Sequence, residues 1–288
     1  MTLSAGARRQ IDNLLTSQPE TAPWLGVLSA VLEEAAEPTW DAVAASTVLQ
    51  AERLPSTPLL AGAHIPIDTR LADRWVRRVL ALTAEAGPEG VGLRAAAGDA
   101  EFDSRAFLEA AVNADGGRLE ALARSLDVDP DVLAAVAALA VMPLLQALRR
   151  RFGPLEAVDP RWHEGHCPIC GGWPHLAQQQ GLERTRRLRC ARCGGDWMQP
   201  GIRCPYCGAI GHESRAALVS EQDGEARKVE TCSACRGYLK SVSTLRAWDG
   251  DEVALIDLAT VDLDLVALER ELERPEPRRL EPGVRVIG

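Results

Sequence analysis

The stretch Cys167-Pro168-Ile169-Cys170-Gly171 decides the fold, because its form, C-P-x-C-G, recurs at Cys204-Pro205-Tyr206-Cys207-Gly208. All eight cysteines of this 288-residue chain lie between positions 167 and 235, in four C-x-x-C pairs: Cys167/Cys170, Cys190/Cys193, Cys204/Cys207 and Cys232/Cys235. Proline pre-sets the turn and glycine accepts the positive φ that follows, so that backbone N–H groups point at the sulfurs. Because two such pairs supply the four thiolates of a tetrahedral site, four pairs predict two metal sites.

The order of the pairs indicates an internal duplication. In each half, a C-P-x-C-G pair is followed after 19 or 24 residues by a pair without proline. The interval carries a β-hairpin pattern, around Gly181 in the first half and Asp223-Gly224 in the second, which is typical of rubredoxin-like or zinc-ribbon units. We expect neighbouring pairs to share a site, so that the predicted metal ligands are Cys167, Cys170, Cys190 and Cys193 in one, and Cys204, Cys207, Cys232 and Cys235 in the other. A cross-braced arrangement, first pair with third and second with fourth, stays open.

Each site is expected to hold one ion of iron or zinc, because sites of four thiolates accept both metals. Disulfides are typical of secreted, loop-rich chains, and the N-terminus does not read as a secretory signal. Redox-active dithiols explain four pairs in two matched sets less well than metal does. Four nearby histidines are expected at the surface or beside the ligands, because complete sets of thiolates leave them no vacancy: His163, His166, His175 and His212.

Charge divides unevenly along the chain. Residues 161–240 contain 12 Lys and Arg against 8 Asp and Glu, so this region carries +4 and the remainder −13 of the total of −9. A cluster of arginines there resembles a phosphate-binding patch of a nucleic-acid-binding protein: Arg184, Arg186, Arg187, Arg189 and Arg192. However, a divalent metal with four thiolates carries −2, and two such sites balance the +4. A nucleic-acid partner is therefore disfavoured.

Residues 1–158 predict an acidic all-α domain. Helical patterns cover Ala5–Ser17, Trp24–Glu37, Trp40–Arg53, Asp68 (as the N-cap) to Ala86, Phe102–Asn113, Arg118–Ser125 and Asp131–Phe152, with a loop over Gly87–Gly98. The apolar run Val132–Leu145 has 14 residues, interrupted by Pro143, whereas a membrane span needs about 20. It predicts a buried, proline-kinked helix instead of a membrane span. Nothing in this half resembles a phosphate loop, a nucleophile elbow or a paired-carboxylate site, so no enzyme activity is expected.

The complete sequence predicts an α+β multidomain protein. The helical domain is followed by a first rubredoxin-like unit over 159–200 and a second over 201–248. Tyr238–Val242 alternates as a strand does, and Asp251–Arg274 has an approximate helical period. Residues 249–288 are therefore expected to form a C-terminal helix that packs on the ribbons, and an irregular tail from Pro275.

The motifs together resemble the formate dehydrogenase accessory protein FdhE family over residues 162–273. The resemblance rests on the cysteine pairs and on these runs: His166-Cys167-Pro168-Ile169-Cys170-Gly171, Trp173-Pro174, Glu230-Thr231-Cys232-Ser233-Ala234-Cys235-Arg236-Gly237-Tyr238-Leu239-Lys240, Asp257-Leu258-Ala259-Thr260 and Leu263-Asp264. One departure is Arg236, which stands where a glycine commonly follows the last cysteine. This departure puts the geometry of the second site in question.

This resemblance implies a cytoplasmic accessory factor that is needed for active formate dehydrogenase and acts on its catalytic subunit, without being a dehydrogenase itself. It also implies iron or zinc bound by the eight cysteines. Two other classes remain to be tested. A nucleic-acid-binding zinc-ribbon protein is one, and a thiol or iron redox protein that acts on a client enzyme is the other. The oligomeric state is not predicted.

Overall fold

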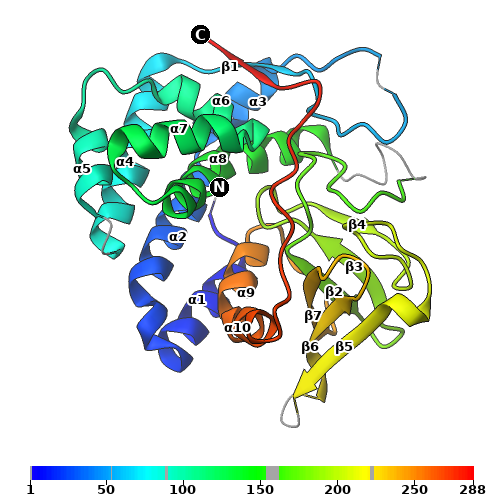
Figure 1. Ribbon diagram of the computed structural model, residues 1–288. Coiled ribbons are helices and arrows are strands. Elements are labelled where there is room, and N and C mark those ends of the chain that lie inside the picture. Colours follow the sequence, from blue (N-terminus) through cyan, green and yellow to red (C-terminus); the bar gives the residue numbers. More distant parts are fainter. Residues whose placement is uncertain (1, 53, 88–89, 154–161, 221–223) are drawn as a thin grey trace.

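A computed structural model describes residues 2–52, 54–87, 90–153, 162–220 and 224–288. Figure 1 shows the helices of the first half as one body and the strands of the second half beside them. The predicted α+β class, with N-terminal helices followed by two four-cysteine units, is confirmed. The predicted boundary between residues 158 and 159 lies outside the described residues, and the division into separate domains stays a prediction.

Helix α8 (Pro130–Phe152) is the centre of the helical body. It contacts α2 (Ala22–Ala35), α3 (Pro38–Ser46), α4 (Thr69–Ala86), α6 (Ser104–Asn113) and α7 (Gly116–Leu126). The indole N–H of Trp75 on α4 donates a 2.7 Å hydrogen bond to the carbonyl of Ala140. Among the described residues, α8 is the one helix long and apolar enough to cross a membrane, and 67% of its apolar window is buried inside the protein. Its apolar surface therefore packs in the core, as predicted.

The predicted helix starts are largely confirmed, and two predictions about the helical half are wrong. The Asp68 carboxylate caps α4 by accepting from the N–H groups of Arg70 and Leu71. Helix α3 ends at Ser46 and not at Arg53, because Val48 pairs instead with His64 of β1 (His64–Pro66). The predicted loop Gly87–Gly98 contains α5 (Gly90–Gly98), which packs against α4. Ahead of them, α1 spans Ala5–Ser17 and a short 3₁₀ turn spans Pro19–Thr21.

Six strands form one sheet in the order β4-β3-β2-β7-β6-β5. The first unit supplies β2 (Leu176–Gln180), β3 (Thr185–Arg189) and β4 (Asp196–Met198), and the second supplies β5 (Arg215–Ser220), β6 (Gly224–Cys232) and β7 (Tyr238–Thr244). Both predicted hairpins are confirmed, with a 3₁₀ turn at His212–Ser214 before the second. Strands β2 and β7 pair in parallel, from Leu176 opposite Lys240 to Gln180 opposite Thr244. This pairing joins the two units into a single sheet.

The core of the helical body continues into the first cysteine unit. One apolar cluster contains Trp75 and Leu144 together with Cys167, Ile169 and Trp197. The backbone continues the contact, because the N–H groups of Leu59 and Leu60 donate to the carbonyls of Pro168 and Ile169 at 2.7 and 3.0 Å. The first unit is thus packed on the helices as well as on the second unit.

The C-terminal segment differs from the prediction in two ways. The expected single helix Asp251–Arg274 is two helices, α9 (Glu252–Ala259) and α10 (Val261–Glu269), because the backbone leaves helical geometry at Thr260, where φ is −118°. The expected irregular tail ends in β8 (Arg285–Ile287), which pairs in parallel with β1. In Figure 1 this segment, coloured red, crosses the molecule from α10 to β1. It therefore ties the ribbon half to the helical half.

Candidate metal centres

The structure brings the cysteines together as neighbouring pairs. Cys167, Cys170, Cys190 and Cys193 form one set and Cys204, Cys207, Cys232 and Cys235 the other, and within each set all sulfurs lie within 4.8 Å of one another. The short Sγ–Sγ distances are 3.5 and 3.5 Å in the first set and 3.8 and 3.7 Å in the second. A tetrahedron with metal–sulfur bonds of 2.3 Å has edges of about 3.8 Å. Both sets therefore fit a zinc or iron ion, and the cross-braced arrangement is not the one formed.

Four turns of the same kind position the sulfurs. In each, the N–H of the first cysteine donates to a carbonyl five residues on, at 2.8 Å for Cys167, 3.0 Å for Cys190, 2.8 Å for Cys204 and 2.9 Å for Cys232. The residue after the second cysteine has a positive φ, +71° at Gly171 and +57° at Arg236. Arg236 thus adopts the glycine conformation, and its guanidinium bonds to Glu271. The departure at Arg236 does not open the second site.

The two sets differ in exposure. All four cysteines of the first set have no exposed surface, whereas Cys207 is exposed and Cys235 is half-buried. A side chain at Gly195 would lie 3.0 Å from the Cys167 sulfur and 3.1 Å from that of Cys193, so glycine is needed there for the close approach. Arg192 anchors the first set to the helical body, because its guanidinium donates to the carbonyls of Ala111 and Val112 on α6. The first set is enclosed and the second is accessible from outside.

In each set one thiol has a lowered pKa, at Cys170 and at Cys232, whereas burial raises the pKa of Cys167 in the first set and of Cys204 in the second. Hydrogen bonds from the thiols of Cys167, Cys190 and Cys193 hold the pKa of Cys170 well below its usual range, although burial opposes this. At Cys232 burial raises the pKa, but the N–H groups of Cys235 and Ala234 outweigh it and lower the pKa to about 7. The turns therefore aim backbone donors at sulfur, as the sequence predicts.

The rival cysteine chemistries find no support in this geometry. All eight cysteines are free, and sulfurs 3.5 Å apart are far beyond the 2.05 Å of a disulfide. The histidines lie outside both sets, as predicted. His163 and His212 are exposed, while the imidazole of His175 accepts a hydrogen bond from the Ala191 N–H at 3.3 Å. Burial lowers the pKa of His175 to about 4, so this side chain is neutral at neutral pH.

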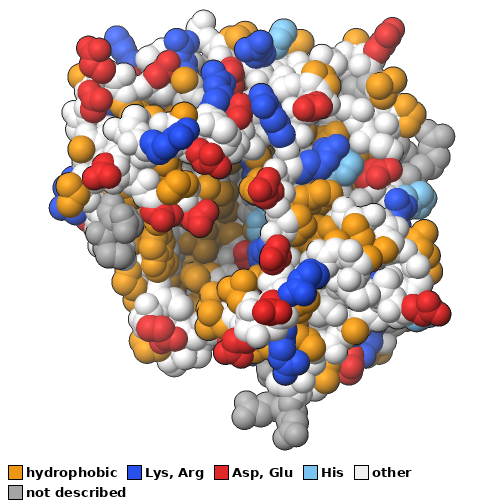
Figure 2. Space-filling model, viewed as in Figure 1, with side chains coloured by type: hydrophobic (Ala, Val, Ile, Leu, Met, Phe, Trp, Pro, Cys, Tyr) orange, Lys and Arg blue, Asp and Glu red, His pale blue; other side chains and the backbone are white. Residues whose placement is uncertain are grey.

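Four of the five arginines of the predicted cluster make contacts within the protein, and the fifth, Arg184, is exposed. Arg186 pairs with Glu230 at 2.8 Å, Arg187 pairs with Asp196 at 2.5 Å, and Arg189 is buried against Gln178 and the carbonyl of Trp248. Arg192 bonds to α6. Figure 2 shows basic side chains interspersed with acidic ones on the face drawn, without a continuous basic surface there. These pairings remove the feature that favoured a nucleic-acid partner.

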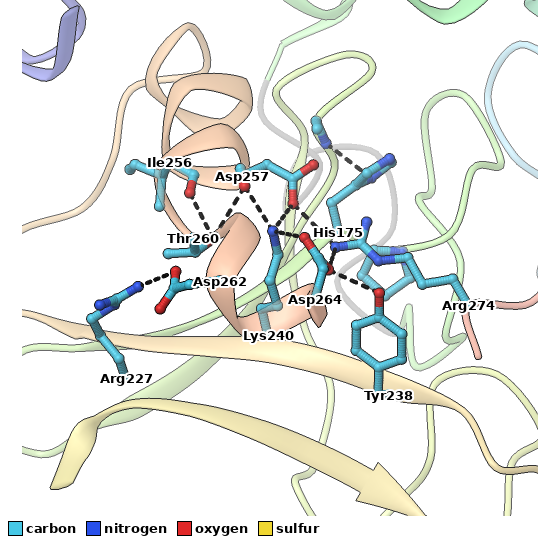
Figure 3. Close-up of polar contacts among 12 residues, drawn as sticks. His175, Arg227, Tyr238, Lys240, Ile256, Asp257, Thr260, Asp262, Asp264 and Arg274 are labelled. Carbon is cyan, nitrogen blue, oxygen red and sulfur yellow. Dashed lines mark hydrogen bonds and ion pairs between the residues drawn. The ribbon is translucent and has the colours of Figure 1, made fainter. Parts of the chain in front are cut away.

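A second polar cluster, which the sequence did not single out as a site, joins β7 to the C-terminal helices (Figure 3). Lys240 on β7 has no exposed surface, and its ammonium lies 2.7 Å from a carboxylate oxygen of both Asp257 and Asp264. Arg274 contacts the same two carboxylates at 3.2 and 2.7 Å, and the Tyr238 hydroxyl donates to Asp264. Burial opposes the charge of Asp257, but Lys240 and Arg274 hold its pKa well below the usual range. The cluster clamps α9 and α10 onto the sheet.

Comparisons with known proteins confirm the resemblance drawn from the motifs. Residues 202–280 match the family model for the C-terminal domain of FdhE. A Protein FdhE homolog of Stutzerimonas stutzeri is 33% identical over 138 residues, which are 45% of this chain and 43% of that protein. One of Pseudomonas aeruginosa is 34% identical over 126 residues, 41% of this chain and 40% of that protein. The match thus spans less than half the length of each of these relatives.

The fold extends the likeness beyond the matched sequence. The crystal structure of the FdhE protein from Pseudomonas aeruginosa superimposes with a TM-score of 0.58, over 96% of this chain and 94% of that one. At 22% identity this likeness is one of fold. The residues that carried the resemblance now have structural roles, because Lys240, Asp257 and Asp264 form the buried clamp.

The exposure difference predicts unequal access to the two sets. When the metal-loaded protein is treated with a chelator and an alkylating reagent, Cys207 and Cys235 should be labelled about tenfold faster than the enclosed cysteines, because a reagent reaches exposed sulfur without opening the fold. Time-resolved mass spectrometry of the peptides measures each rate. As a control, Cys207→Ala should lose one ion and leave the first set protected. Labelling of all eight cysteines at one rate would contradict the assignment.

The clamp predicts a large cost for removing its central cation. Lys240→Met leaves Asp257 and Asp264 buried with Arg274 alone, which should lower the free energy of unfolding by about 3–5 kcal/mol. Because the pKa of Asp257 is depressed in the folded protein, this contribution is present above about pH 4 and is lost as the pH falls further. Denaturant unfolding of the metal-loaded protein measures it. The matched control is Lys228→Met on β6, where the partner Glu225 is exposed and little change is expected; equal costs for the two variants would refute the role of Lys240.

Proposed function

We propose that this chain is an accessory factor in the maturation of formate dehydrogenase, and that it holds two metal ions, of iron or zinc, with its eight cysteines. The observation that carries the proposal is the pair of four-sulfur sets inside a chain that resembles the FdhE family in sequence and fold. Each set has the spacing of a tetrahedral tetrathiolate site. The ligands would be Cys167, Cys170, Cys190 and Cys193 for one ion, and Cys204, Cys207, Cys232 and Cys235 for the other.

The partner in this proposal is the catalytic subunit of formate dehydrogenase, met in the cytoplasm. Both sets have four protein ligands, which leaves no open position of the kind that catalytic zinc sites keep. We therefore assign the chain a role by contact and not as an enzyme.

We assign different roles to the two sulfur sets. The first is enclosed and continuous with the core of the helical body, so its metal would stabilise the fold. The second has an exposed cysteine on the ribbon surface, where a client protein could reach it. Loss of the second metal should therefore impair the partner interaction more than the fold.

A second candidate function rests on the same exposed cysteine. With iron bound, a four-thiolate site carries one electron, and the accessibility of Cys207 would allow exchange with a client enzyme. Zinc has no redox chemistry, so an absorption spectrum that identifies iron, followed by reversible reduction, separates this candidate from a purely structural role.

The experiment combines client binding with activity in cells that lack their own accessory protein. Cys232→Ala with Cys235→Ala should remove one ion, keep the helical circular dichroism, and reduce co-purification with the tagged catalytic subunit about tenfold or more, with formate oxidation falling accordingly. Cys167→Ala with Cys170→Ala should also lower the unfolding temperature.

The matched control is Leu182→Ser. Leu182 lies in the turn of the first hairpin, is 93% exposed and belongs to neither sulfur set, so this variant should restore activity fully. If the double cysteine variants lack metal and still restore formate oxidation, the metal sites have no part in the function. If the unchanged protein restores nothing in its own host and binds no catalytic subunit, the proposed function fails.

A further inference from the structure

A cavity of about 600 Å³ lies between the helical body and the first cysteine unit. Helices α2 and α8 line one side, and the turn after Cys193 and the loop before α9 line the other. Its walls include the apolar side chains of Leu32, Ile169 and Trp248. No cysteine of either sulfur set lines the cavity. Gly194 and Gly195, which directly follow Cys193 of the first set, form part of its wall.

Three buried hydrogen-bond donors of this cavity have no partner among the described residues: the side-chain amide of Gln146, the Nε of Arg149 and the Nε of Arg189. Gln146 is 3% exposed and Arg189 is 1% exposed, so bulk water does not satisfy these atoms. A buried donor without an acceptor destabilises the folded state. All three groups donate, so the partner that each of them lacks is a hydrogen-bond acceptor.

The charges of the cavity point to an anion. Arg150 and Arg187 also line it, but they pair with Asp41 at 2.8 Å and with Asp196 at 2.5 Å. The side chain of Arg149 makes no hydrogen bond or ion pair with any described residue. Its guanidinium lies against Gly250, where a Cβ atom would meet it at 2.4 Å.

Arg189 reaches the same loop by donating to the carbonyl of Trp248, and its nearest carboxylate oxygen, on Asp196, is 3.8 Å away. The other two acids of the cavity do not neutralise Arg149. Asp251 accepts from the N–H and hydroxyl of Ser4, and Asp249 is exposed. Two guanidinium groups thus line one cavity, and the carboxylate nearest to Arg189 is already paired with Arg187.

We propose that this cavity binds a small organic phosphate monoester. Two guanidinium groups and one amide, from three different side chains, match the three terminal oxygens and double negative charge of such a group. A carboxylate offers only two oxygens and one charge. The cavity is much larger than a phosphate ion, and Leu32, Ile169 and Trp248 provide an apolar wall for the organic part.

Binding there joins the two halves of the molecule. Gln146 and Arg149 belong to α8, whereas Arg189 belongs to β3 and directly precedes Cys190. A ligand held by all three side chains should therefore raise the unfolding temperature of the full chain, since only the folded state brings them together. This inference does not depend on the client that the chain serves.

The test uses the full-length, metal-loaded protein with phenyl phosphate, inorganic phosphate and benzoate at constant ionic strength, by calorimetry and thermal unfolding. Phenyl phosphate should bind saturably, raise the unfolding temperature, and bind about tenfold or more tightly than benzoate, which has the same ring with a carboxylate. Arg149→Met should weaken phenyl phosphate about tenfold or more, and Arg149→Lys should weaken it less.

The matched control is Arg151→Met, which removes the same charge from α8 at a residue that does not line the cavity. Its affinity should equal that of the unchanged protein. No saturable binding of phenyl phosphate would overturn the proposal, as would equal affinity in Arg149→Met. Tighter binding of benzoate than of phenyl phosphate would overturn the assignment to phosphate. Should Arg149→Met fail to fold, the Arg149→Lys variant carries the comparison with Arg151→Met.

Discussion

The rest of the structure depends on the requirement that four sulfurs surround one point. In the first set this requirement draws two turns together at Sγ–Sγ distances of 3.5 Å with no solvent around them. Small ribbon units bury too little apolar surface to be stable alone, so a bound divalent cation, which cancels half of the thiolate charge, would stabilise them. The turns lie just before β2 and directly after β3, and so fix where β2 begins and where β3 ends.

The sheet and the C-terminal segment connect the first sulfur set to the rest of the chain. Parallel pairing of β2 with β7 makes the two units one sheet, and the buried Lys240 holds α9 and α10 against it. The chain then returns to the helical body, where the N–H of Val286 donates to Glu109 and β8 pairs with β1. At the other end, Ser4 bonds to Asp251, so both termini are tied to the opposite half. The halves are held by polar contacts as well as by the shared core.

Local chemistry explains which features could be predicted from the sequence. The cysteine turns, the hairpin around Gly181 and the cap at Asp68 each depend on residues a few positions apart, and all three are confirmed. The sequence did not predict helix α5, because its glycines are typical of loops. Gly92 instead permits close packing, since a Cβ there would lie 2.3 Å from the carbonyl of Leu126. Three other features depend on residues far apart in the chain: strand β8, the clamp at Lys240 and the cavity between Arg149 and Arg189. No local sequence pattern predicts them.

The central claim is that the eight cysteines hold two metal ions, one in each set. Native mass spectrometry of protein purified without air, combined with thiol titration, tests it most directly. We predict a mass that corresponds to two ions per chain, no rapidly titrating thiol in the native protein, and eight thiols once it is denatured with a chelator. A mass with one ion or none, together with four or more thiols that titrate freely in the native protein, would contradict the account.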